Sequence, residues 1–426
     1  MFRRGRRGVR HGHLRIGNHP HRGRHGNARR GCRAHQSRSG HVGRDASGTC
    51  RRSRQGTRPG RRVHQHGMRR HRRLPGSTAG GARVTDSSMR TIAGELAGLG
   101  LSVVVDAPFG ALTTYGVGGT AAVMVEITGA ADARAVGKVM ASHPGVDVCA
   151  FGNGSNTLVS DGGFDGLVVR TRPGTSPDEM AVVVSNATVT VPAWMPLPVL
   201  ARRSVAAGAC GLEWAVGVPG TVGGAVRMNA GGHGAEIIDS LVSVDVVSLR
   251  TGQSATFGAH ELALHFRGSA LGQSHCVVSA TFGVNAPDGH RCEDALAEIV
   301  SWRRQNQPGG RNAGSVFVNP APGNGSSGAL IDRCGLRGRA VGGAAVSDKH
   351  ANFIQASPGA TASDIIGLMT LVQDQVREST GITLLSEVRL VGFADAVIAR
   401  FADSSHETVG IRAARSAMAR RLGEQS

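Results

Sequence analysis

The sequence predicts a folded region of mixed helices and strands over residues 89–393. The first observation is an alternation near its start. AAVMVEIT (121–128) has the composition of a buried strand, DARAVGKVMASH (132–143) has helical spacing, and VDVCAFG (146–152) is again a strand. The second observation is that glycine-rich turns follow such strands. The third is a further block of helices and strands that begins near Ala286. The alternation favours an α/β unit.

The remaining expected elements continue the mixed pattern. A short amphipathic helix begins near Thr91, ahead of the first strand. We then expect strands at 166–171 and 181–193, helices at 196–208, 293–306, 327–335 and 362–380, and strands near 339–347, 351–356 and 384–392. The Arg- and Ala-rich tail from Ala394 is expected to be a weak, frayed helix.

The net charge of +19 suggests a nucleic-acid-binding protein, but its distribution argues against that interpretation. Residues 1–88 hold 24 of the 49 basic residues and two of the 30 acidic ones, so this segment carries +22 and the remainder −3. It has no apolar period, and we interpret it as non-globular. It is either sequence upstream of a true start at Met89 or a disordered native arm. Its His pairs lack a cysteine pattern, so we expect no metal site.

The cysteines and the apolar runs indicate a cytoplasmic protein. Seven cysteines show no CxxC pair, so we expect reduced, mostly buried thiols without a role. Neither a secretory signal nor an apolar run long enough to span a membrane is present in the sequence. We therefore expect no membrane partner and no nucleic-acid partner.

Two glycine-rich clusters are candidates for binding a phosphorylated cofactor. GNGSN (152–156) directly follows a strand, and glycine lets backbone N–H groups approach a phosphate. A Rossmann fingerprint would need a third glycine, where the chain has Thr157. GVPGTVGGAVRMNAGGHG (217–234) is too rich in glycine for the interior of a helix or strand. Two such loops suit a pyrophosphate-containing dinucleotide such as FAD.

Six motifs in this order resemble the UDP-N-acetylenolpyruvoylglucosamine reductase (MurB) family. They are TTYGVGG (113–119), FGNGSNTLVSDGGFDGLVV (151–169), the second glycine cluster, NAGSVFVNP (312–320), the segment 329–354 and SEVRLVG (386–392). The resemblance spans about residues 106–393. It implies an α+β fold in which a two-lobed FAD-binding domain of the PCMH/vanillyl-alcohol-oxidase type (89–285) precedes a smaller α+β substrate-binding domain (286–393), with a tail at 394–426.

The resemblance also implies the cofactors, the reaction and the partners. FAD would be the cofactor and NADPH the co-substrate, in a ping-pong reduction of UDP-N-acetylglucosamine enolpyruvate during peptidoglycan precursor synthesis. The protein is expected to be a monomer. The residues carried over as FAD contacts are Tyr115, Gly118, Gly152, Asn153, Gly154, Ser155, Asn156, Pro219, Gly220, Thr221, Gly223, Gly224, Asn229 and Gly231.

Three further residues match the catalytic positions of the family. Ser315, in GSVFVNP, would protonate the substrate, which requires a carbanion or enolate within hydrogen-bond reach. Arg267, in LHFRGSAL, would hold charge on the substrate carboxylate and enolate. Glu387, in SEVRLVG, would support the same polarisation, as an acid or through a water. Asn319 and His350 match positions that face the UDP-sugar.

The chain departs from the family pattern in two places. Phe266 stands where a tyrosine often precedes the arginine. Asn306 stands where a lysine is often found, and we expect Arg303, Arg304 or Arg311 to replace that cation. The chain also lacks a tyrosine for a substrate-capping loop, so it resembles the loop-lacking subtype. The alternative enzyme is a sugar or lactone oxidase of the same FAD fold.

Overall fold

The computed structural model describes residues 86–174, 182–286, 290–402 and 408–424. The Arg-, His- and Gly-rich segment up to residue 85 lies outside these residues. Residues 86–88, the last three of the segment predicted to be non-globular, form the first turn of helix α1, so this helix begins earlier than the sequence predicts. Within the described residues no helix is long and apolar enough to cross a membrane.

The first lobe is a four-stranded sheet covered by two helices. Its elements are α1 (Asp86–Gly98), β1 (Ser102–Ala107), β2 (Ala121–Ile127), α2 (Ala130–Ala141), β3 (Asp147–Phe151) and β5 (Phe164–Thr171), with sheet order β1-β2-β5-β3. β2, β5 and β3 are parallel, and β1 is antiparallel to β2. The helices bury Ile92, Leu96, Val136 and Met140 against these strands. This arrangement places the turn after β3 at the carboxyl edge of the parallel strands, where α/β proteins bind ligands.

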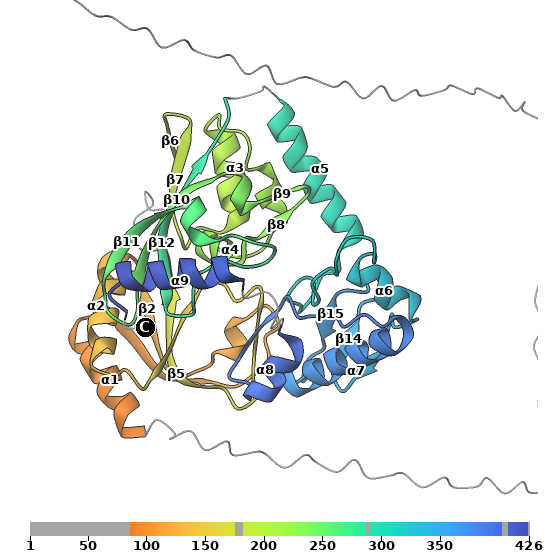
Figure 1. The fold of residues 1–426 in the computed structure, drawn as a ribbon, viewed down its shortest axis with the longest axis horizontal. Helices are drawn as coiled ribbons and strands as arrows, with labels where there is room; N and C mark the ends of the chain where they lie inside the picture. The colour runs from red at the N-terminus through yellow and green to blue at the C-terminus, as the bar shows by residue number, and fades with distance from the viewer. Residues whose placement is uncertain (1–85, 175–181, 287–289, 403–407, 425–426) are drawn as a thin grey trace, which may run out of the picture. The chain divides into compact units, whose positions relative to one another are not determined.

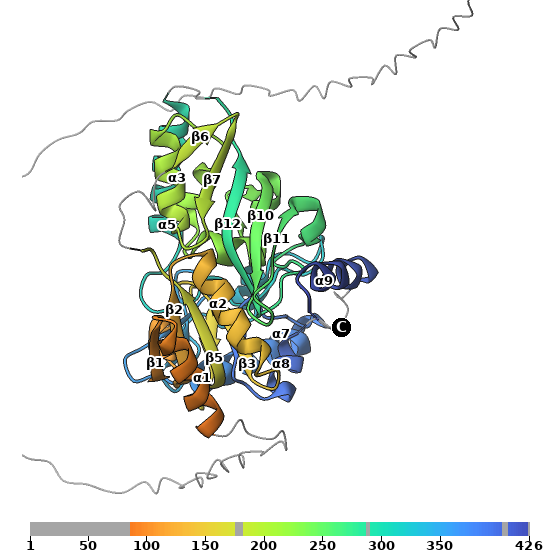
Figure 2. The ribbon, with the colours of Figure 1, turned by 90° about the vertical axis from the view of Figure 1, so that its left-hand side faces the viewer.

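The second lobe is a five-stranded antiparallel sheet with helices over one face (Figures 1 and 2). Its strands are β6 (Val183–Ser185), β7 (Thr188–Pro192), β10 (Leu241–Ser248), β11 (Ser254–Gly258) and β12 (His275–Gly283), in the order β11-β10-β12-β7-β6. Between β7 and β10 lie α3 (Leu197–Ala206), the 3-10 helix η3 (Glu213–Gly217), α4 (Val222–Met228), β8 (Gly231–Gly232) and β9 (Ala235–Glu236).

The C-terminal domain packs helices against a small sheet. It comprises α6 (Ser327–Arg333), β13 (Ala340–Val341), β14 (Ala344–Val346), β15 (Ile354–Ala356) and α7 (Ala362–Thr380). The preceding helix α5 (Arg291–Asn306) packs on the core of the second lobe through Leu296, Ile299 and Val300. α7 begins with a reciprocal capping box between Thr361 and Asp364 and ends at Gly381, whose φ is +74°. Its buried residues, among them Ile365, Leu368, Met369, Val372 and Val376, recur at helical spacing.

One strand of this last part returns to the first lobe. β16 (Arg389–Val391) pairs in parallel with β4 (Thr157–Val159), which directly follows the first glycine-rich turn. Phe317 and Ser386 form a further bridge, so NAGSVFVNP and SEVRLVG lie side by side. The pairing therefore connects the turn after β3 to both motifs that carry the predicted acids.

The expectation of a frayed tail is wrong. The tail forms α8 (Asp395–Phe401) and α9 (Val409–Arg421), and α9 lies beside β11 in Figures 1 and 2. Met418 and Leu422 are fully buried in the core of the second lobe. Glu424 accepts a hydrogen bond from Ser248 Oγ (2.6 Å) and contacts His275 Nε2 (3.2 Å). Only a few apolar residues of this segment are buried, so its sequence shows little helical periodicity. Those few residues nevertheless pack into the core of the second lobe.

The expectation that the cysteines are all reduced is also wrong for one pair. Cys210, after α3, and Cys292, in the first turn of α5, form a disulfide. Cys149, Cys276 and Cys334 are free thiols. The two cysteines nearest the N-terminus lie outside the described residues.

Candidate functional site

A cavity of about 710 Å³ receives side chains from both lobes and from the C-terminal domain. Its size falls in the range of about 300–1,000 Å³ that is common for ligand and cofactor sites. Most of the predicted site residues line it: Gly152, Asn153, Gly154, Ser155, Asn156, Pro219, Gly220, Thr221, Gly223, Gly224, Gly231, Arg267, Ser315 and Glu387.

The two glycine-rich loops meet along one wall of the cavity. Ser155 Oγ donates a hydrogen bond to the carbonyl of Pro219 over 3.2 Å. Gly220 has a φ of +116°, and a Cβ there would lie 2.6 Å from Ser155 Oγ. Gly154 has a φ of +60°, and a Cβ there would lie 2.9 Å from Thr113 Cα. Glycine at 220 therefore allows the two loops to pack this closely, and glycine at 154 allows the first loop to pack on Thr113.

Gly223 has a different explanation from the one the sequence suggests. A Cβ at Gly223 would lie 3.1 Å from Ala193 Cβ. Close packing of α4 against the end of β7 is thus sufficient to explain this glycine. Thr221 caps the same helix, with its Oγ1 accepting from Gly224 N–H.

Two further cations line the cavity, and sequence reasoning assigned neither of them. They are Arg227, half-buried on α4, and Arg389, exposed at the start of β16. Desolvation by the surrounding protein, followed by the proximity of Arg227 and Arg415, lowers the pKa of Arg389 to about 10. Arg389 is therefore still charged at neutral pH, and a bound anion would offset the cost of this desolvation. Arg389 lies within a motif quoted above, so its position in SEVRLVG was the available signal.

Arg267 lies between two carboxylates. Its Nε donates to Glu387 Oε1 over 2.7 Å, and its Nη1 donates to Glu236 Oε1 over 3.0 Å. Its backbone has a φ of +57°, an unusual conformation for a residue other than glycine. Its guanidinium also lies 4.6 Å from the ring centroid of Phe266, so the aromatic ring keeps a role there without a hydroxyl.

The electrostatic surroundings of Glu387 favour its protonated form. Burial raises its pKa, Arg267 opposes that shift, and Glu236 adds to it. The backbone of Glu387 is fixed next to the Ser315 motif. The N–H of Glu387 donates to the carbonyl of Val316 over 2.8 Å, directly beside Ser315.

Glu236 is a functional candidate that sequence reasoning missed. Its Oε2 accepts from Asn229 Nδ2 (2.9 Å), while Oε1 accepts from Arg267. Asn229 is buried, does not line the cavity, and also donates to the carbonyl of His265. Asn229 therefore orients Glu236 in this structure. An acidic residue just after the second glycine cluster was the only local signal.

Four other predicted site residues do not line this cavity. Tyr115 is fully buried in the core of the C-terminal domain, and that burial raises its pKa. A Cβ at Gly118 would lie 2.3 Å from the carbonyl oxygen of Val159. Asn319 Oδ1 accepts from the N–H of Ser327, and the ring of His350 packs on Phe353. Their cofactor and substrate contacts stay predictions.

The structure also distinguishes the three arginines expected to replace the cation missing at Asn306. Arg303 lines the cavity, and its Nε donates to Gln307 Oε1 over 2.7 Å. Arg304 and Arg311 are not among the lining residues. Asn306 is exposed and donates to the carbonyl of Trp302.

Comparisons with known proteins agree with this geometry. Residues 121–258 match the family described as an FAD binding domain, and residues 305–391 match the C-terminal domain of UDP-N-acetylenolpyruvoylglucosamine reductase. The chain is 42% identical over 286 residues to that reductase from Gloeobacter violaceus, covering 66% of this chain and 93% of the relative. It is 41% identical over 293 residues to the reductase from a Synechococcus strain, covering 67% and 92%.

A solved structure shows the same arrangement. The reductase from Thermus caldophilus superposes with a TM-score of 0.57 at 30% identity, covering 68% of this chain and 98% of that one. The two glycine-rich loops, the arginines that line the cavity and the lobed sheets fit FAD, and they define an FAD-dependent oxidoreductase. The predicted fold class is confirmed. The chain belongs to the UDP-N-acetylenolpyruvoylglucosamine reductase family.

Proposed function

We propose that this enzyme uses NADPH to reduce UDP-N-acetylglucosamine enolpyruvate to UDP-N-acetylmuramate, in the cytoplasmic synthesis of peptidoglycan precursors. The observation that supports this most strongly is that Arg267, Glu387 and Ser315 line the same cavity as both glycine-rich loops. FAD, when bound, supplies the hydride transfer from NADPH to the β-carbon of the enolpyruvyl group.

Ser315 is the proton donor to the α-carbon in this proposal. A serine hydroxyl is a weak acid, so it needs a fixed position next to the developing negative charge. The next residue, Val316, is fixed by two backbone hydrogen bonds. The N–H of Val316 donates to the carbonyl of Asn352, and the carbonyl of Val316 accepts from the N–H of Glu387, each over 2.8 Å.

Arg267 holds the substrate carboxylate as negative charge builds on the enolate. Its hydrogen bonds to Glu387, Glu236 and the carbonyl of Asn229 use Nε and Nη1. Among the described residues Nη2 has no such bond, so it is available to an anionic substrate. A permanent cation fixed in this way stabilises the transition state without a proton transfer.

Glu387 supports the same polarisation, as an acid or through a water. Because burial raises its pKa, it keeps a proton at higher pH than an exposed glutamate does. A partly protonated Glu387 would donate toward the substrate carboxylate while still accepting from Arg267. Arg303, which also lines the cavity, supplies the cation for the substrate diphosphate.

The test is a pair of spectroscopic half-reactions on the purified protein under anaerobic conditions. NADPH should bleach the absorbance of oxidised flavin, and the UDP-sugar substrate should restore it. The sugar product should gain two hydrogens by mass spectrometry. Flavin that is instead reduced by a sugar or lactone, and reoxidised by O₂ without NADPH, would show an oxidase.

A further inference from the structure

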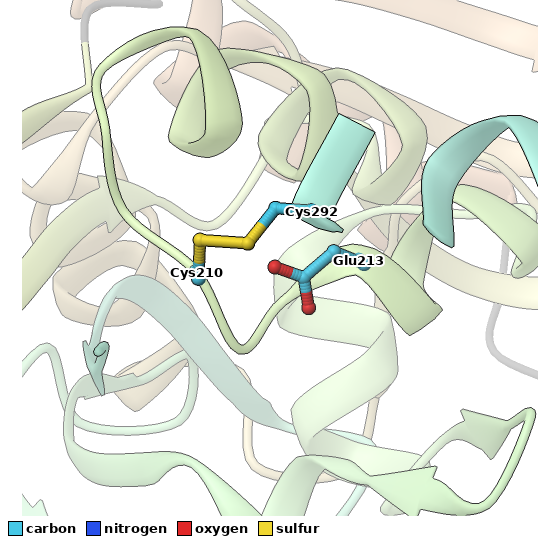
Figure 3. A group of neighbouring side chains, drawn as sticks. All are labelled: Cys210, Glu213 and Cys292. Carbon is cyan, nitrogen blue, oxygen red and sulfur yellow. A yellow bond between two sulfur atoms is a disulfide. The ribbon is translucent and has the colours of Figure 1, made fainter. Parts of the chain in front are cut away.

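The disulfide between Cys210 and Cys292 lies outside the cavity and has no part in the proposed reaction. Figure 3 shows Cys292 at the start of α5, Cys210 on the loop after α3, and the Glu213 carboxylate facing the sulfurs. The ligand atoms of these three residues all lie within 4.8 Å of one another. Glu213 is fixed by the N–H of Gly211, which donates to its carboxylate over 2.8 Å.

The first turn of α5 buries one side chain. Cys292 is the one buried residue of this 16-residue helix, and Leu296, a turn later, is partly buried against the core of the second lobe. The residues on either side of it, Arg291 and Glu293, are exposed. On the other side of the bond, Cys210 is anchored by two backbone hydrogen bonds with Asn285. The disulfide therefore fastens the exposed N-terminal end of α5 to a fixed point of the second lobe.

The other end of α5 reaches the cavity. Arg303 lines it, and the neighbouring Trp302 packs edge-on against the ring of His233 in the second glycine cluster. A helix transmits the position of one end to the other because its backbone hydrogen bonds make it stiff. Loosening the first turns of α5 would thus change how firmly Arg303 is held.

We propose that Cys210 and Cys292 are a reversible thiol–disulfide site that controls the rigidity of α5. In the reduced chain, the Cys292 thiolate attacks a low-molecular-weight disulfide and releases one small thiol. The Cys210 thiolate then attacks the mixed disulfide, forms the bond in the structure and releases the second small thiol. The two protein thiols lose two electrons and two protons, and the small disulfide gains them.

The order of attack follows from the local electrostatics. Cys292 lies in the first turn of α5, where the helix dipole stabilises a thiolate. The Glu213 carboxylate lies beside both sulfurs and disfavours either thiolate, so only the helix terminus at Cys292 distinguishes the two. Cys149 and Cys276 are buried, and burial raises the pKa of each thiol. Oxidation should therefore select the Cys210–Cys292 pair.

The first experiment maps thiols in the full chain after incubation with a reduced or an oxidised small thiol. After oxidation, peptide mass spectrometry should find Cys210 linked to Cys292 with the loss of two hydrogens. Cys149, Cys276 and Cys334 should stay free, and Cys334→Ser should leave the linkage unchanged. The idea is overturned if no linked peptide forms in protein that keeps its flavin. It is also overturned if the reduced chain takes up one equivalent of Zn²⁺ at these residues and then resists oxidation.

The second experiment measures hydrogen exchange of α5 in both redox states. Amides in its first turns should exchange at least about tenfold faster in the reduced chain. Amide exchange in Cys292→Ser should match that of the reduced parent. If this variant folds poorly, the comparison of the reduced and oxidised parent is sufficient. Equal exchange in both states would overturn the proposed control of rigidity. We also expect the reduced chain to have a higher KM for the UDP-sugar, and this expectation rests on the proposed function. Thiol mapping and hydrogen exchange do not depend on that function. The redox proposal and the proposed function can therefore fail separately.

Discussion

Asn156 donates a hydrogen bond from its side-chain amide to the main-chain oxygen of Glu387 over 2.9 Å, although 231 residues separate them in the chain. In the opposite direction, the N–H of Arg389 donates a hydrogen bond to the carbonyl of Asn156. The first glycine-rich loop and the segment that carries Glu387, just before β16, are therefore parts of one unit. A change in one should affect both cofactor binding and substrate reduction.

Ser315→Ala should separate the two half-reactions. Reduction of the flavin by NADPH requires no proton donor to carbon, so it should proceed at about the parent rate. Reoxidation by the UDP-sugar should slow by about 10²- to 10⁴-fold, the usual contribution of a general acid. Stopped-flow absorbance measures each step. Ser301→Ala, at an exposed position of α5, is the control. Equal reoxidation in Ser315→Ala and parent would leave Ser315 as a turn residue.

Glu236→Gln should lower substrate reduction and change its pH dependence. Glu236 raises the pKa of Glu387, so loss of its charge should move the Glu387 limb of the pH–rate profile to lower pH. Arg267 would also be less well fixed, and reoxidation by substrate should slow by about tenfold. Flavin content should not change. Asp239→Asn, which removes a carboxylate bonded to the Glu236 N–H only, should leave the profile in place. An unshifted profile in Glu236→Gln contradicts the coupling.

Gly154→Val should reduce FAD occupancy sharply. The φ of +60° is unfavourable for valine, and the new Cβ would lie 2.7 Å from the Phe151 ring and 2.9 Å from Thr113 Cα. Gly145→Val is the matched control, because nothing lies within 4 Å of a Cβ there. Flavin absorbance per protein gives the occupancy. Gly223→Val should also lower it, through the displacement of α4 from Ala193. Normal occupancy in Gly154→Val would mean that the cofactor lies elsewhere.

Glu424→Gln should destabilise the second lobe in a pH-dependent way. Burial pushes the pKa of Glu424 up, but its hydrogen bonds from His275 and Ser248 outweigh that effect and hold it below the usual value. A lowered folded-state pKa stabilises the protein above the unfolded-state pKa, and this stabilisation is lost as the pH falls through the folded-state value. The variant should lose about 1 kcal/mol of unfolding free energy at neutral pH and converge with the parent in acid. Urea unfolding across pH measures this, with the exposed Glu378→Gln as control. A pH-independent difference would contradict the assignment.

The parts of the site that lie in short contiguous motifs could be predicted from the sequence. Gly152, Gly220 and Ser315 each belong to a run whose composition alone restricts the backbone or the chemistry. Glu236 could not be predicted, because its importance comes from Arg267, which approaches it only after the chain has folded. The same holds for Arg227, whose α4 position carries no sign that it faces a cavity.

The disulfide and the tail were missed for related reasons. Cys210 and Cys292 lie 82 residues apart, and no local pattern pairs cysteines over that distance. α9 buries only Ile411 and Met418, so its apolar signal is too sparse to distinguish it from a frayed end. Tertiary packing, rather than helix propensity, decides the structure there.

The packing of α9 has a consequence for biosynthesis. Met418 and Leu422 complete the core of the second lobe, yet the whole C-terminal domain is translated between that lobe's last strand and these residues. During translation, the core of the second lobe therefore stays incomplete, with apolar side chains exposed, until residues 409–422 have left the ribosome. Nascent chains that stall before that point should be favoured substrates for chaperones and proteases.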